Sequence, residues 1–300
     1  MHKETLLTAA RAQRAATLRR VATLPDPAWD QQVPPPPPPP GVVRLDTPAR
    51  TLRDIVAHLV VVDEMAVRGG ALRGWVSARR GEPVQPWDRR RIAPLASLSV
   101  TELVTLLARR GQRFAQLLAA APAAIAHVPV RGPFGRQPLL HVVARRVLHE
   151  WLHEHDVAAV AGGAVSAAPA PEIAATLADA VLAGLPAATL PLVPRSRGVV
   201  RLLVAVAPDA DGEASQQRAW AVDFGRHLYG PRVVTPADAT VHLSTAALTL
   251  LASRRATPED PELGVRIEGD TRLGLDVLAR LALPSEQGRQ HSPRPLPTAP

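Results

Sequence analysis

The spacing of apolar residues changes once along this 300-residue chain, near Arg195, and the change limits the folds that the chain can adopt. Before Arg195, apolar residues recur every three or four positions, which is the spacing of amphipathic helices. After it, short apolar stretches alternate with turn-forming residues, which is typical of strands. With 46% hydrophobic residues, the chain has enough apolar side chains for a packed core. We therefore predict an α bundle over residues 1–190, an α+β domain over residues 195–284 and a disordered tail over residues 285–300.

Two of the predicted helices begin with a recognisable capping motif. Thr51-x-x-Asp54 and Ser99-x-x-Glu102 both fit the capping box, in which two side chains bind free backbone N–H groups of the first helical turn. The predicted helices of the bundle span residues 3–24, 51–69, 99–120, 138–162 and 171–185. The predicted elements of the second part are strands over residues 199–207, 217–224, 239–243 and 263–267 and helices over residues 245–253 and 271–283.

The composition argues against several classes of protein. The net charge is +8, but the arginines are spread along the chain and aromatic residues make up only 3%, so we do not expect nucleic-acid binding. The longest uncharged run, Phe114–Val130, is too short for a membrane span and contains prolines. The chain contains no cysteine, and its first residues lack the apolar core expected of a signal peptide, so we expect a cytoplasmic protein without disulfides, either monomer or homodimer. We interpret the proline run Pro34–Pro40 as a stiff spacer, with a ligand for a proline-reading module as the alternative.

Three histidines suggest a metal site. His149 and His153 are four residues apart in a predicted helix, so their Cβ atoms would lie on one face, about 5–6 Å apart. Two imidazoles placed in this way can bind one divalent metal at about 2.0–2.1 Å, and the third ligand must come from elsewhere. His58, in a separate apolar helix, is the candidate for that third ligand. The alternative is that the histidines are solvated, or hydrogen-bonded without metal.

Two further residues fall on the same side of the predicted helix. Arg146 and Asp156 flank the histidine pair there, whereas Glu150 and Glu154 point elsewhere. Burying such a polar face without compensation would cost several kcal/mol, and a metal would remove much of that cost. We take Arg146 and Asp156 as candidate catalytic residues: Arg146 would bind a substrate carboxylate. For Asp156, a simple salt bridge between helices is the role that we favour over a catalytic one, and a solvated helix charge is the alternative for Arg146.

Several motifs resemble those of one known family. Residues 51–59 (TLRDIVAHL) and 146–157 (RVLHEWLHEHDV) resemble the second-helix and fourth-helix motifs of the mycothiol-dependent maleylpyruvate isomerase family, a branch of the DinB-like four-helix bundles. Residues 239–243 and 265–270 resemble its second domain, which is similar to a sterol-carrier fold. The resemblance implies an up-down four-helix bundle followed by a small sterol-carrier-like domain. It also implies a divalent metal, usually zinc, and mycothiol as a cofactor.

The resemblance further implies which residues hold the metal, namely those that match His58, His149 and His153. The chain departs from the family pattern at two positions: the isomerase prototype has Glu where this chain has His149, and the tryptophan that is common before the second-helix threonine is Arg50 here. Both departures argue against maleylpyruvate as the substrate more than they argue against metal binding.

The sequence therefore predicts an enzyme, a thiol-dependent isomerase or S-transferase that acts on a small electrophilic substrate. Two alternatives remain at this stage. One is a metal-dependent hydrolase, in which the same metal activates water. The other is a non-catalytic binding module, in which the metal stabilises the bundle and the second domain holds a hydrophobic ligand.

Overall fold

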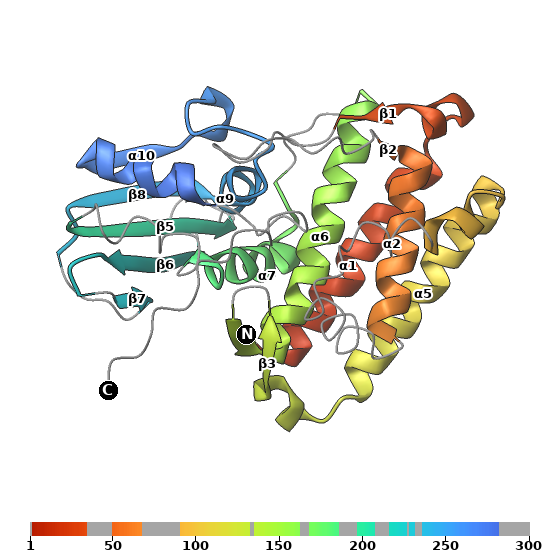
Figure 1. Cartoon of the computed structure of the whole chain (residues 1–300), viewed down its shortest axis with the longest axis horizontal. Coiled ribbons are helices and arrows are strands. Elements are labelled where there is room, and N and C mark those ends of the chain that lie inside the picture. Colours follow the sequence, from red (N-terminus) through yellow and green to blue (C-terminus); the bar gives the residue numbers. More distant parts are fainter. Residues whose placement is uncertain are drawn as a thin grey trace, which may run out of the picture.

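A helical bundle and a mixed sheet make up the computed structural model of the chain (Figure 1). The predicted class, an α bundle followed by an α+β part, is confirmed. The structure describes residues 2–34, 50–67, 91–132, 135–162, 168–185, 197–207, 216–226, 228–231 and 236–281. Most of the proline run Pro34–Pro40, the residues 186–196 that join the two parts and the predicted tail lie outside these ranges.

Four helices form the bundle, and both predicted capping boxes are present. The Thr51 amide donates to the Asp54 carboxylate and the Asp54 amide to the Thr51 hydroxyl, each at 3.1 Å. The Ser99 amide donates to Glu102 at 2.8 Å, and the Glu102 amide donates back to the Ser99 hydroxyl. These caps begin two of the four helices, which are α1 (Lys3–Ala22), α2 (Leu52–Val67), α5 (Val100–Ala120) and α6 (Leu139–Val160).

The order of the helices in space determines which side chains can meet. Helix α1 packs against both α5 and α6, and α2 packs against α5 (Figure 1). Helices α2 and α6 have only a few close backbone contacts, so large side chains fill the space between them. A further helix, α7 (Pro171–Leu182), packs on α1 and α6 and also contacts the sheet.

The sheet has five strands in the order β7-β6-β5-β8-β9. Strands β5 and β8 are parallel, and the other neighbours are antiparallel. Two helices, α9 (Thr245–Ala252) and α10 (Thr271–Arg280), accompany it. The strands are β5 (Val199–Ala207), β6 (Gln216–Asp223), β7 (Leu228–Gly230), β8 (Ala239–Ser244) and β9 (Arg266–Gly269).

Some short elements were not predicted. The last strand begins three residues later than expected, because Pro261–Leu263 forms a 3-10 turn that ends at Gly264 with a φ of 60°. Strand β7 is only three residues long, too short for a periodic pattern. The other unpredicted elements are two short antiparallel pairs, β1 (Gln32–Val33) with β2 (Arg50–Thr51) and β3 (Pro129–Gly132) with β4 (Gly135–Pro138), and three further 3-10 turns over Asp26–Asp30, Ala93–Leu95 and Ala123–His127.

Apolar packing continues from the bundle into the sheet. One cluster of buried side chains includes Leu6 of α1, Leu148 of α6, Leu177 of α7 and Leu202 of β5. A second cluster fills the other side of the bundle, around α2 and α5. The bundle and the sheet are therefore in direct apolar contact, and the predicted boundaries at residues 190 and 195 stay a prediction. Among the helices described, none is both long and apolar enough to cross a membrane.

Candidate metal centre

Three histidine side chains meet between α2 and α6. The Nε2 atom of His149 lies 3.0 Å from Nε2 of His58 and 3.2 Å from Nε2 of His153. The three potential ligand atoms all lie within 4.8 Å of one another. Two ligands bound at about 2.0–2.1 Å in tetrahedral geometry would be about 3.3–3.4 Å apart, close to the two separations that involve His149.

The local sequence explains why these histidines face one another. His149 and His153 are one helical turn apart on α6, and their ring centroids are 4.5 Å apart. His58 lies in α2 between buried neighbours such as Ile55 and Leu59, and only 2% of His58 is exposed. The apolar residues fix the helix in the core, and the imidazole therefore points to α6 rather than to solvent.

The proton positions favour a cation at the centre of the three rings. Asp156 accepts a hydrogen bond from Nδ1 of His153 at 3.0 Å, so we assign the proton of His153 to Nδ1 and a lone pair to Nε2. A single proton on Nε2 of His149 cannot make straight hydrogen bonds to both neighbouring rings. Without a cation, at least one of these two close pairs of imidazole nitrogens therefore lacks a good hydrogen bond. A bound cation would instead accept one lone pair from each of the three rings. The chemistry of this donor set fits a divalent metal.

The electrostatic surroundings keep two of the histidines neutral. Burial is the largest cause that lowers the pKa of His149 well below its usual value, and the nearby His153, His58 and Arg146 lower it further. Burial also lowers the pKa of His153 to about 4, although Asp156 acts in the opposite direction. Both rings are therefore neutral near pH 7, the form in which histidine binds metals.

Asp156 is held on its other side by Arg255, a residue of the second part of the chain. The Arg255 Nε and Nη2 atoms donate to the two oxygens of Asp156, both at 2.7 Å. Burial alone would raise the pKa of Asp156, but hydrogen bonds from His153 and Arg255 and the charge of Arg255 hold it well below its usual range. The carboxylate is therefore ionised and joins Arg255 to His153.

Arg146 lies in a separate buried network of charges. Its Nε donates to Asp63 at 2.8 Å, and its Nη1 lies 3.1 Å from Glu150. Arg14 of α1 donates to the same two carboxylates, at 2.6 Å to each. Two guanidinium groups thus balance two carboxylates inside the bundle. Glu150 points to α1, away from the histidines, as predicted, and the substrate-binding role of Arg146 stays a prediction.

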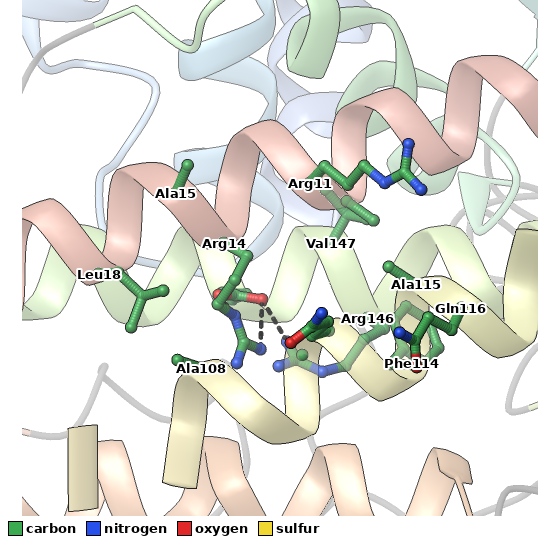
Figure 2. Close-up of a pocket in the computed structure, with 14 residues that line it drawn as sticks. Arg11, Arg14, Ala15, Leu18, Ala108, Phe114, Ala115, Gln116, Arg146 and Val147 are labelled. Atoms are coloured by element: carbon green, nitrogen blue, oxygen red, sulfur yellow. Dashed lines mark hydrogen bonds and ion pairs between the residues drawn. The ribbon is translucent and has the colours of Figure 1, made fainter. Parts of the chain in front are cut away.

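A cavity of about 430 Å³ adjoins this network between α1, α5 and α6 (Figure 2). Arg14, Arg146 and Glu150 line it together with small residues such as Ala108 and Gly111. None of the three histidines lines it. The cavity and the histidine cluster are therefore different places in the bundle, connected through α6.

Several residues of this region were not predicted from the sequence. Asp63 carries a local signal, because it is a charged residue that follows a run of buried apolar positions in α2. Arg14 and Arg255 carry none, since each is one arginine among many and meets its partner only in the fold, 136 residues from Glu150 and 99 residues from Asp156 respectively.

Part of the chain matches the sequence model of a known superfamily. Residues 9–156 match the sequence model of the DinB superfamily. The crystal structure of a mycothiol-dependent maleylpyruvate isomerase aligns with 85% of this chain and 90% of its own, at 18% identity and a TM-score of 0.46. A histidine-to-alanine mutant of that enzyme aligns over the same shares, at 16% identity and a TM-score of 0.45.

No curated protein matched the chain. The superfamily match covers the bundle helices α2, α5 and α6 as far as Asp156, and so it includes His58, His149 and His153. The part of the chain that holds the three histidines is thus similar to the DinB superfamily.

Proposed function

We propose that the chain is a metal-dependent enzyme that activates a low-molecular-weight thiol for isomerisation of, or transfer to, a small electrophilic substrate. One observation carries the proposal: three imidazole nitrogens converge, and no fourth ligand side chain joins them among the described residues. Structural zinc sites are closed by four protein ligands, whereas catalytic sites keep a position open for water or substrate. The donor set is therefore that of a catalytic site.

The ion would supply one kind of chemistry. A divalent cation such as zinc lowers the pKa of a thiol or a water that it binds, so that either becomes a nucleophile near neutral pH. Neutral imidazoles add no negative charge, so the ion would keep its full charge for that purpose. The chain contains no cysteine, so the thiol must come from solution. Mycothiol is the first thiol to test, because residues 51–59 and 146–157 resemble motifs of a mycothiol-dependent family.

The residues of the chain have distinct parts in this proposal. His58, His149 and His153 hold the ion, and Asp156 orients the His153 ring through Nδ1. Arg146 is the proposed contact for a substrate carboxylate. Its Nη1 and Nη2 atoms are buried near Glu150 and Asp63 but make no hydrogen bond of good geometry among the described residues.

A thiol titration of the cobalt-loaded protein tests the proposal. Sulfur bound to cobalt produces a strong charge-transfer absorption in the near ultraviolet, so mycothiol should produce this band in the wild type. The band should be absent in His149→Ala and present in His155→Ala, a matched control on the same helix outside the histidine cluster. Turnover of a panel of electrophilic substrates should then require the thiol.

Other outcomes would select a different function. If the thiol leaves the cobalt spectrum unchanged while the metal-loaded protein hydrolyses esters or amides, the chain is a hydrolase. If neither thiol nor water is activated although metal binds tightly, the bundle is a metal-stabilised binding module. A cytoplasmic location and a monomeric or dimeric state are further proposals, which rest on the sequence.

A further inference from the structure

Arg255 reaches the metal centre from a strained turn. Helix α9 ends in a Schellman motif, in which the Arg254 amide donates to the Leu251 carbonyl at 3.0 Å and the Arg255 amide to the Leu250 carbonyl at 2.9 Å. The motif requires a left-handed residue, usually glycine, but here Arg254 adopts a φ of 61°. It is the only non-glycine residue with a positive φ among those described. Strained residues of this kind cluster at functional sites, which suggests that the turn has a functional role in placing Arg255.

The turn places the Arg255 guanidinium on Asp156 with both hydrogen bonds at 2.7 Å. Two-point contacts of this type fix the plane of a carboxylate as well as its position. The Oδ2 atom of Asp156 then lies 3.0 Å from Nδ1 of His153. Both ends of this chain of contacts are largely buried, since the Arg255 and Asp156 side chains are 13% and 14% exposed.

We propose that Arg255 is a positioning residue of the metal centre, which acts through Asp156 to fix the orientation and tautomer of His153. The inference rests on the proposed function, because it requires that the three histidines bind a metal. Partners behind a ligand histidine typically change metal affinity about 10–100-fold when they are mutated. By this means the sheet-containing part of the chain controls the metal affinity of a site whose ligands all belong to the bundle.

Another ion pair in the same protein provides a matched control. Arg218 of β6 contacts Asp179 of α7 at 3.2 Å and so also joins the sheet to a helix. Its side chain is 44% exposed, and only its Nε atom is bonded to Asp179. Neither residue belongs to the histidine cluster. A variant of Arg218 therefore removes a contact between the same two parts without touching the metal centre.

The experiment measures zinc affinity of the full-length protein by competition with a chromophoric chelator, next to thermal melting of the metal-free protein. Arg255→Gln should weaken zinc binding about tenfold or more, and Arg218→Gln should leave it unchanged. Arg255→Lys keeps the charge but not the two-point contact, so its affinity should lie between those of wild type and Arg255→Gln. If the Gln variant does not fold, the Lys variant provides the comparison.

A double-mutant cycle separates positioning from general stability. If Arg255 acts through Asp156, adding Arg255→Gln to Asp156→Asn should weaken zinc binding by less than about threefold further. Nitrogen-15 spectra of the metal-free imidazoles should show His153 protonated on Nδ1 in wild type and a mixture of tautomers in Arg255→Gln.

The outcomes distinguish this inference from the proposed function. Wild-type protein that binds no zinc would overturn both. If wild type and Arg255→Gln bind zinc equally well and show the same tautomer of His153, the positioning role is wrong, while the metal-dependent function stands. Additive losses in the double mutant would also overturn it, because Arg255 would then act on the ion independently of Asp156.

Discussion

Removal of one carboxylate from the buried network should strongly destabilise the bundle. Asp63 has no exposed surface, and its two oxygens pair with Arg14 at 2.6 Å and Arg146 at 2.7 Å. Burial alone would lower the pKa of Arg14, but the charges of Glu150 and Asp63 outweigh burial and raise it. Because an arginine side chain stays protonated in proteins, removal of Asp63 leaves two guanidinium charges opposite one carboxylate, and one positive charge becomes unbalanced.

The expected magnitude follows from this imbalance. Loss of one partner of a buried ion pair costs about 3–5 kcal/mol, so Asp63→Ala should lose about this much stability. For a chain of this size the loss corresponds to a fall in melting temperature of roughly 5–8 °C. Asp179→Ala, which breaks the partly exposed pair with Arg218, should lose no more than about 1 kcal/mol.

Calorimetry and urea denaturation of both variants, with a chelator present, would measure the two losses without a contribution from bound metal. The chelator matters because any ion bound to the folded state would add its own stabilisation. An Asp63→Ala protein within about 1 kcal/mol of wild type, with an unchanged dependence on urea, would refute the reasoning. It would mean that water or a rearranged Glu150 neutralises both guanidinium groups.

Two further substitutions and one proteolysis experiment have expected outcomes. Gly111→Ala should lower the melting temperature although alanine favours helices, because the new Cβ would lie 2.7 Å from Nη1 of Arg14. Four hydrogen bonds hold the Arg14 guanidinium group in place, so it cannot easily move away. A rise in melting temperature would contradict this. Arg254→Gly should stabilise the protein by about 1 kcal/mol through relief of the left-handed strain, and a loss of stability would count against the strain. Limited proteolysis should cut first between Leu185 and Arg201, and rapid cleavage elsewhere in the bundle and sheet would argue against two compact parts.

Much of the fold could be predicted because its signals are local. The two capping boxes depend on residues three positions apart, and both helices begin where Thr51 and Ser99 predict. The positions of His149 and His153 were predictable for the same reason, since a helix brings residues four apart onto one face. His58 joined the prediction as a histidine in an otherwise apolar stretch, which the structure buries in the core.

The remaining parts of the site depend on contacts that no local pattern encodes. Asp156 was predicted on the correct side of α6, but its partner Arg255 follows a short helix of the sheet-containing part and lies 99 residues away in sequence. Arg146 was predicted beside the histidines without the carboxylates that surround it, because Asp63 belongs to a different helix. Short strands such as β7 were missed because three residues form no period.

Metal analysis of the purified protein tests the central claim most directly. After dialysis against metal-free buffer, elemental analysis should find about one divalent ion, zinc first of all, per wild-type chain. The ion should be lost from His58→Ala, His149→Ala and His153→Ala, while His155→Ala should retain it, because the ligand atoms of the first three converge and His155 lies outside the cluster. Wild-type protein without metal, or full retention of metal in the three ligand variants, would contradict the account.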